Sequence, residues 1–184
     1  GSCSGCAADI DASGVVDFND LLVLLADFGP CEDPLPVGVS YYNLAGTNPS
    51  VLPDFSGLTP ISTGEMLQIN LASTGGAFGT SGLSDDVGAV FTSMIDFPEA
   101  GVWTLYTESD DGSKLLVDGT LVVDNDGLHG MVEVGGTIEV SEPGPMAVRV
   151  EFFERGGGAG LIVRWQGPGV AKAVVPSSAW RPAG

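Results

Sequence analysis

The apolar residues beyond position 37 occur in short runs that are separated by clusters of Gly, Pro, Asn and Asp. Two of these runs, 101–107 and 147–153, alternate apolar and polar residues with period two, which is typical of strands that bury one face. The spacing of the runs predicts a mainly β, antiparallel sandwich or barrel. We expect strands at 38–43, 66–71, 88–94, 101–107, 114–117, 121–123, 137–140, 147–153 and 160–165.

The N-terminal segment follows a different period. Five apolar residues at i, i+3, i+4, i+7 and i+10 predict one amphipathic helix that ends at Gly29-Pro30. The acidic, proline-bearing stretch 32–36 cannot continue this helix. We therefore divide the chain into a small loop-and-helix unit at 1–33, a linker at 34–36 and a β domain at 37–184. The apolar helix residues are Phe18, Leu21, Leu22, Leu25 and Phe28.

Residues 9–20 read D-I-D-A-S-G-V-V-D-F-N-D, with oxygen-bearing side chains at loop positions 1, 3, 5, 9 and 12 and glycine at position 6. This is the spacing of an EF-hand loop, in which the chain wraps around calcium and offers oxygens at alternate positions. The predicted metal ligands are the side chains of Asp9, Asp11, Ser13, Asp17 and Asp20 and the backbone carbonyl of Val15. In the alternative interpretation, Asp17 caps the helix and the other acids are solvated turn residues.

The loop and its single helix, closed by Asp in place of Glu, resemble one dockerin repeat over residues 6–31. A dockerin has two such repeats and binds a cohesin, whereas this chain shows one. The resemblance therefore implies a calcium-stabilised unit or a docking helix in place of a cohesin-binding module.

Three cysteines lie in this segment. Cys6 and Cys31 bracket the calcium loop and its helix, so a disulfide between them would stabilise a unit too small to own a core, in an oxidising compartment. Cys3 would then be free or bonded to another chain, and its pairing with Cys31 is a second arrangement. Three free thiols, or a metal half-site at Cys3 and Cys6, are the other interpretations.

A longer motif lies in the β region. Residues 99–119 read E-A-G-V-W-T-L-Y-T-E-S-D-D-G-S-K-L-L-V-D-G, a strand that runs into S-D-D-G-S and a hairpin that closes at V-D-G. This segment resembles the central signature of PA14 domains, and residues 122–130, 149–154 and 161–165 are similar to the later strands of that family. The resemblance extends over residues 37–182. It implies a β-sandwich found in adhesins, toxins, glycosidases and yeast flocculins, where it serves mostly in binding.

The resemblance also implies a site. In the lectin members the paired aspartates, joined by a cis peptide bond, hold a calcium ion that ligates vicinal sugar hydroxyls, and the matching residues are Asp110 and Asp111. Lectin members add a side-chain ligand from a late loop, but the corresponding loop, 155–160, offers neither carboxylate nor amide. The loop with Asp124, Asn125 and Asp126 is the other candidate for ligand binding. Structural members keep S-D-D-G as a turn, in which the aspartates bond backbone amides and the glycine adopts a positive φ.

Charge and composition exclude several functions. The chain has 24 acidic and six basic residues, a net charge of −18, so nucleic acid is not expected as a partner. No apolar run approaches the roughly 18–20 residues of a membrane span. The one histidine, His129, lies in a glycine-flanked turn, and the sequence has no G-x-S-x-G motif, so we expect no catalytic triad and no enzyme.

The sequence as a whole predicts a non-enzymatic, extracellular module, secreted or at the cell surface. It would use calcium as its cofactor for carbohydrate recognition or adhesion, with a glycan or another surface protein as partner. One alternative is a structural or assembly domain of a large secreted protein or fibre, which binds protein and can self-assemble. The other is an accessory domain of a glycoside hydrolase.

Overall fold

A computed structural model describes residues 17–18 and 35–183. The chain divides into two units, Gly1–Asp33 and Pro34–Gly184, and all the strands given below belong to the second. Asp17 is described and exposed. The other predicted residues of the N-terminal unit lie outside the described residues, namely the calcium ligands Asp9, Asp11, Ser13, Val15 and Asp20, the helix after Phe18, and the cysteines Cys3, Cys6 and Cys31.

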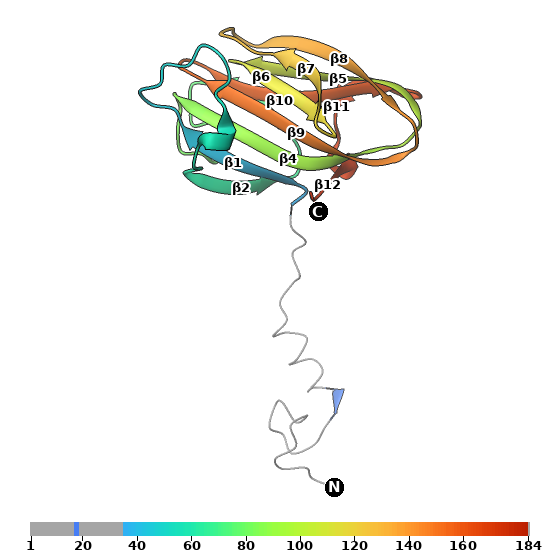
Figure 1. Ribbon diagram of the computed structural model, residues 1–184. Coiled ribbons are helices and arrows are strands. Elements are labelled where there is room, and N and C mark those ends of the chain that lie inside the picture. The colour runs from blue at the N-terminus through green and yellow to red at the C-terminus, as the bar shows by residue number, and fades with distance from the viewer. Residues whose placement is uncertain (1–16, 19–34, 184) are drawn as a thin grey trace. The chain divides into compact units, whose positions relative to one another are not determined.

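Residues 35–183 form two antiparallel sheets that pack against each other (Figure 1). The seven-stranded sheet has the order β2-β1-β4-β9-β6-β7, with β12 added beside β4, and the five-stranded sheet has the order β11-β10-β5-β8, with β3 added beside β10. The predicted mainly β, antiparallel architecture is confirmed.

The twelve strands of residues 35–183 are divided between the two sheets as follows. The larger sheet contains β1 (Val37–Asn43), β2 (Ser62–Met66), β4 (Val87–Phe97), β6 (Ser113–Val117), β7 (Thr120–Asn125), β9 (Gly144–Glu154) and β12 (Trp180–Arg181). The smaller sheet contains β3 (Asn70–Thr74), β5 (Gly101–Asp110), β8 (Val132–Val140), β10 (Ala159–Gly167) and β11 (Val170–Val174). Within residues 35–183, two short 3₁₀ helices also occur, η1 (Phe55–Gly57) and η2 (Ser177–Ala179).

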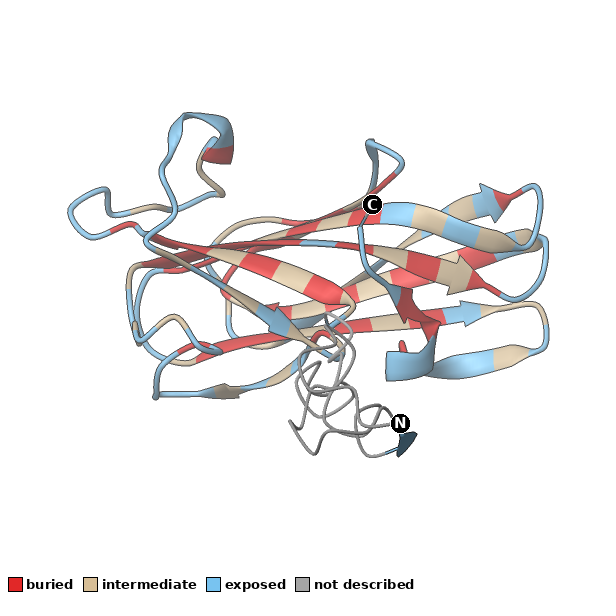
Figure 2. Ribbon diagram, turned by 90° about the horizontal axis from the view of Figure 1, so that it is seen from below, coloured by how far each residue is buried: buried red, intermediate tan, exposed pale blue. Residues whose placement is uncertain are grey.

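The core lies between the two sheets and follows the period-two pattern of the strands (Figure 2). In β5 the inward positions change from Trp103 and Leu105 in the middle of the strand to Thr107 and Ser109 near its end, and all four are buried. An aromatic cluster fills the apolar part, where the Trp103 and Trp165 rings lie 5.0 Å apart. The core is therefore apolar in the middle and polar toward the end at which β5 stops.

One strand prediction is wrong. The apolar run 66–71 was expected to be one strand, but it spans the last residue of β2, the connection 67–69 and the first two residues of β3. Ile69 in this connection is fully buried, and its carbonyl accepts a hydrogen bond from the Val163 amide of β10, whereas Leu67 is exposed. The run is apolar because the connection covers one end of the core, and burial of a single residue does not require a paired strand.

Three strand ends come together where the chain changes sheets. β5 of the smaller sheet ends at Asp110, and β6 of the larger sheet begins at Ser113 only three residues later. β9 ends at Glu154 on the larger sheet, and its continuation returns as β10, in which Gly160 pairs with Asp110. The end of the sandwich therefore gathers side chains from both sheets. Among the described residues, no helix has the length and apolarity needed to cross a membrane.

Candidate functional site

Three carboxylates meet at this end of the sandwich. Asp110, Asp111 and Glu154 each contribute one oxygen, and these oxygens all lie within 4.8 Å of one another. The peptide bond between Asp110 and Asp111 is cis, as the resemblance to lectin members implies. Asp110 is half-buried, and Asp111 and Glu154 are buried. We call these three residues the carboxylate cluster; in the part of the chain that the structure describes, it is the one acidic group of this kind.

Asp111 joins two loops through its side chain. Its Oδ1 accepts a hydrogen bond from the backbone amide of His129 at 3.0 Å, and its Oδ2 accepts one from the amide of Arg155 at 3.1 Å. Asp110 is held from a third segment, because its Oδ2 accepts a hydrogen bond from the Ser73 hydroxyl of β3 at 2.9 Å. The two aspartates are therefore fixed by chain segments from both sheets.

Glu154 has a different environment. Its side chain is 0% exposed, and neither carboxylate oxygen has a hydrogen-bond partner within residues 35–183. Burial, followed by the negative charge of Asp111 and the smaller effect of Asp110, raises the pKa of Glu154 to about 7, against the opposing effect of the nearby Gly156 amide. An ionised carboxylate is costly to bury without a partner, so this residue favours either a proton or a cation beside it.

Glycines allow the neighbouring loops to approach the carboxylate cluster. A Cβ atom at Gly158 would lie 2.6 Å from Ser73 Oγ and 2.9 Å from Asp110 Oδ2, distances too short for a methyl group. A Cβ atom at Gly112 would lie 2.8 Å from the backbone nitrogen of Gly127. The positive φ expected for this glycine in a structural turn is wrong, because Gly112 is not among the positive-φ residues. Glycine is needed there for close packing against the next loop.

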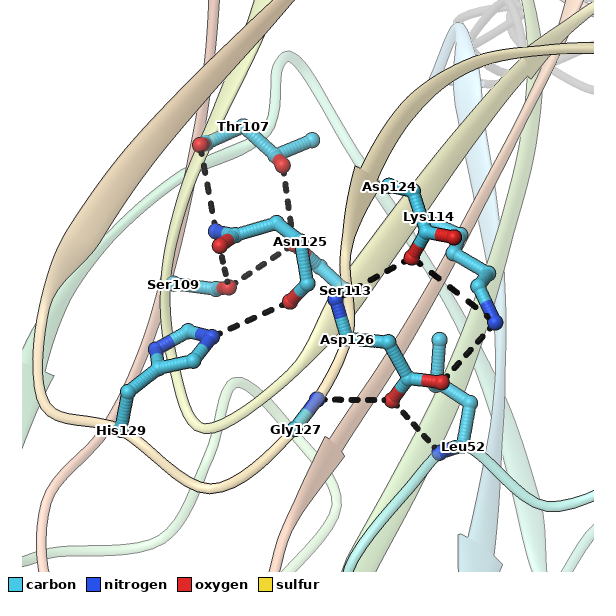
Figure 3. A network of polar contacts seen from close by, with 10 residues as sticks. All are labelled: Leu52, Thr107, Ser109, Ser113, Lys114, Asp124, Asn125, Asp126, Gly127 and His129. Atoms are coloured by element: carbon cyan, nitrogen blue, oxygen red, sulfur yellow. Dashed lines mark hydrogen bonds and ion pairs between the residues drawn. The ribbon is translucent and has the colours of Figure 1, made fainter.

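The other predicted ligand-binding residues lie outside the carboxylate cluster. Lys114 Nζ lies 2.8 Å from Asp126 Oδ2 and 3.9 Å from Asp124 Oδ1 (Figure 3). Asp126 Oδ1 also accepts the amide of Leu52 at 2.8 Å. The hydrogen bond to Asp126 is the main cause that raises the pKa of Lys114 above its ordinary value. We call Lys114, Asp124 and Asp126 the lysine-bridged group, and its contacts fix the loop that follows β7.

Asn125 and His129 direct their polar atoms toward the protein itself. The Asn125 amide donates to the carbonyl of Val132 at 2.9 Å and to Ser109 Oγ at 3.1 Å, and it is buried among the polar residues at the end of β5. The ring nitrogens of His129 lie 2.9 Å from the Gly130 carbonyl and 3.1 Å from the Asn125 carbonyl. Both side chains therefore serve as internal contacts of the loop, as Figure 3 shows for Asn125 and His129.

Sequence reasoning missed Glu154. The further side-chain ligand was expected from the loop 155–160, which begins one residue after Glu154. The last three residues of β9, Phe152, Phe153 and Glu154, are all buried, so the alternation stops at the end of this strand. A glutamate that directly follows two apolar residues and precedes a glycine-rich loop was the available signal.

The donor set fits a hard divalent cation. Calcium takes six to eight oxygen ligands at roughly 2.3–2.6 Å, and convergent carboxylates are its usual protein ligands, whereas softer metals prefer sulfur and imidazole. An aspartate oxygen that accepts one amide hydrogen bond retains a lone pair for a metal. Glu154 adds a buried carboxylate whose oxygens have no hydrogen-bond partner in the described structure. The residues present are thus suited to calcium.

Aromatic side chains do not form an exposed platform in the described domain. The three tryptophans, Trp103, Trp165 and Trp180, are at most 5% exposed and belong to the core. Ligand contacts at this end of the sandwich would therefore come from polar groups and from short apolar side chains such as Leu128, which is 41% exposed.

Comparisons with known proteins agree with this description. The family model of the PA14 domain matches residues 53–179. No match was found among the curated proteins.

Three solved structures illustrate the likeness. An anti-sigma factor domain-containing protein aligns with a TM-score of 0.68 and 22% identity over 82% of this chain and 48% of that chain, so this chain spans about half of its length. A PA14 sugar-binding domain from an RTX adhesin aligns with a TM-score of 0.65 and 19% identity over 82% and 99% of the two chains. The Epithelial Adhesin 9 A domain from Candida glabrata, in complex with Galβ1-3GlcNAc, aligns with a TM-score of 0.60 and 8% identity over 80% and 88%. At these identities the likenesses show the fold.

Proposed function

The chain belongs to the PA14 domain family, and from this premise we propose that its β domain is a calcium-dependent module for carbohydrate recognition or adhesion. Two of the similar structures are named as a sugar-binding domain and as an adhesin domain in complex with a glycan. Fold alone does not fix function, so the proposal depends on the site.

The observation that carries the proposal is the carboxylate cluster with Glu154 at its buried side. Three carboxylates converge there, and among the described residues no lysine or arginine forms an ion pair with any of them. Like charges this close destabilise one another, and a divalent cation reverses the sign of the interaction.

Asp110, Asp111 and Glu154 would hold the calcium ion. Bound there, calcium would offer its remaining coordination positions to vicinal hydroxyl groups of a sugar. The residues around it hold the carboxylates in place: Ser73 orients Asp110, and the amides of His129 and Arg155 orient Asp111.

A glycan array tests this function. The domain is applied in calcium and again in excess chelator, alongside a Glu154→Gln variant, which keeps the shape of the side chain but removes its charge. We expect glycan signals that the chelator and the substitution both abolish. Glycan binding that persists in chelator would contradict a calcium-dependent mode, and an array without any signal would contradict carbohydrate recognition.

We further propose that the protein is extracellular, secreted or at the cell surface, and that it binds without catalysis. In the described domain, both ring nitrogens of His129 lie against backbone carbonyls of its own loop, which does not favour a role for this imidazole in catalysis. Turnover of aryl glycosides that one acid-to-amide substitution abolishes would overturn this part.

The N-terminal calcium loop remains a separate proposal that rests on its spacing. Asp9, Asp11, Ser13, Val15, Asp17 and Asp20 would bind a second calcium ion, and Cys6 and Cys31 would be joined by a disulfide. Calcium calorimetry of the full chain should then yield two sites, of which an Asp9→Ala, Asp20→Ala variant loses one. Mass spectrometry of unreduced peptides identifies the cysteine pairing.

A structural role is the second candidate, and one observation favours it. Both oxygens of Asp111 accept backbone amides, so this aspartate links two loops whether or not a ligand is present. In that case the domain would bind protein in a larger assembly, calcium would raise stability alone, and the glycan array would show no calcium-dependent signal.

A further inference from the structure

Arg155 has a fixed backbone and an exposed side chain beside the carboxylate cluster. It directly follows Glu154, and its amide donates to Asp111 Oδ2 at 3.1 Å. Its carbonyl accepts a hydrogen bond from the Asp86 amide at 3.3 Å. The backbone is thus held from two sides, while the side chain is exposed to solvent. The backbone from which the side chain extends is therefore fixed beside the cluster.

Arg155 also differs from the other basic residues. Five of the six bases form ion pairs with acidic side chains, whereas Arg155 forms none among residues 35–183. In a chain with 24 acidic residues, an arginine without an acidic partner is the exception. The paired bases are Lys114, Arg149, Arg164, Lys172 and Arg181.

From these two observations we propose that Arg155 makes the site select glycans that carry a carboxylate, such as those containing uronic or sialic acids. This inference rests on the proposed function, because the carboxylate cluster must first hold calcium and a sugar. A guanidinium group binds a carboxylate through two parallel hydrogen bonds, which gives both energy and orientation. An arginine side chain is long enough to reach an acidic substituent on a sugar that is seated at the cluster.

Because the chain is strongly acidic, binding of an acidic glycan would depend on a local positive charge, which Arg155 provides. A net charge of −18 repels acidic ligands in general, but charges more than about 8 Å away are largely screened at physiological ionic strength. Arg155 directly follows Glu154, and its amide binds Asp111, so it is the base placed to act on a ligand at the cluster. Without it, the acidic substituent would meet Asp85 and Asp86, which lie on the facing loop and contact the backbone of residues 155–157.

One competing role for Arg155 is to balance the charge of the carboxylate cluster. Three carboxylates and one calcium ion leave one negative charge, which a nearby guanidinium could offset. This role predicts tighter calcium binding when the arginine is replaced, because a positive charge that repels the ion is removed, with no change in the choice of glycan. Selection of acidic glycans predicts instead that the choice of glycan changes and that calcium binding is not altered, so the two roles are separable.

The test uses an Arg155→Gln variant with Arg149→Gln as its matched control. Arg149 lies in the middle of β9, pairs with Glu151 at 2.8 Å and is partly exposed, so its replacement removes the same charge away from the site. An array in calcium buffer compares uronic-acid and sialic-acid glycans with neutral glycans of matched linkage. Calorimetry measures the calcium affinity of all three proteins.

We expect the natural protein to prefer the acidic member of a matched pair by about tenfold, which corresponds to about 1.4 kcal/mol. Arg155→Gln should bring this ratio to about one without weakening calcium binding, because glutamine keeps the backbone amide that binds Asp111, and Arg149→Gln should keep the preference. Three results would overturn the inference: a preference of the natural protein for neutral glycans, an unchanged ratio in Arg155→Gln, or an equal loss of preference in both variants. Calcium-dependent binding of neutral glycans would still support the proposed function. If the natural protein binds calcium but no glycan of either kind, the proposed function itself fails.

Discussion

Two acidic groups lie side by side at one end of the sandwich, and they differ in their source of positive charge. The lysine-bridged group contains Asp124 and Asp126 with Lys114 between them. Within the described domain, the carboxylate cluster of Asp110, Asp111 and Glu154 is contacted by backbone amides and one hydroxyl and forms no ion pair with a basic side chain. A Cβ atom at Gly112 would lie 2.8 Å from the backbone nitrogen of Gly127, so the segments that carry the two groups touch.

The difference shows how an acidic group acquires a role. Where the chain supplies a lysine, the aspartates are neutralised in place and fix a loop, as the bond from the Leu52 amide to Asp126 illustrates. Where the chain supplies only amides and one hydroxyl, a buried glutamate is left without a hydrogen-bond partner in the described structure. The second arrangement is the one suited to a cation from solution.

The largest expected effect is the loss of calcium binding from the carboxylate cluster. Replacement of Glu154 by Gln removes one of three charges at the buried side, so we expect the calcium affinity to fall about 100-fold, or about 2.7 kcal/mol. Calorimetry of the β domain measures it. Asp124→Asn is the matched control, because it removes one carboxylate from the lysine-bridged group. The calcium affinity of this variant should stay within about twofold of that of the natural protein. Equal losses in both variants would abolish the distinction between the groups.

The metal-free protein should also depend on pH through Glu154. Its pKa is raised from 4.5 to about 7 in the folded state, so the proton stabilises the fold fully below about pH 4.5, and this contribution is lost as the pH rises through about 7. Relative to Glu154→Gln, the natural protein should lose about 2 kcal/mol between pH 5 and pH 8. Urea unfolding of calcium-stripped protein measures this difference. A difference between the two proteins that stays constant over this range would place Glu154 in a solvated setting.

A smaller effect is expected from the glycine that lets the loop after β9 approach Asp110. In Gly158→Ala the new methyl group would lie 2.9 Å from Asp110 Oδ2, so the carboxylate or the loop must move. We expect the calcium affinity to fall about tenfold, or about 1.4 kcal/mol. Gly156→Ala is the control, because its Cβ atom would lie 3.6 Å from Asp85 Oδ1, an ordinary contact. Equal affinities in the two variants would show that the loop yields without disturbing the cluster.

The sequence predicted much of the fold and two of the three residues of the carboxylate cluster. The alternation in β5 and β9 and the S-D-D-G-S segment predicted the sandwich and Asp110 and Asp111 as a pair. Glu154 was not predicted, because its place depends on the pairing of β9 with β4, where Glu154 lies opposite Val87. The apolar residues before Glu154 indicate that the strand end is buried, but which groups lie beside Glu154 depends on this long-range pairing.

The role of Lys114 was hidden by a local irregularity. Regular pairing of the hairpin from Val117 and Thr120 would place Lys114 opposite Val123. The register shifts by one residue between Leu115 and Leu116, and Lys114 then pairs with Asp124. A β-bulge of this kind redirects side chains, and alternation in the sequence does not reveal it. For this reason Asp124 and Asp126, at the end of β7 and directly after it, could be interpreted from the sequence as free ligands.

The smallest expected effect comes from the lysine itself. Replacement of Lys114 by Met keeps the length of its apolar stem but removes the charge between Asp124 and Asp126. Because the Lys114 side chain is 27% exposed and that of Asp126 16% exposed, the pair is partly screened, and we expect a loss of about 1 kcal/mol. This corresponds to a Tm lower by about 2–4 °C in a domain of this size. Calcium affinity should remain unchanged, since the lysine does not contact the carboxylate cluster. A large gain in calcium binding on this substitution would mean that the aspartates of the lysine-bridged group become ligands as soon as their own base is removed, and that the lysine alone separates the two groups.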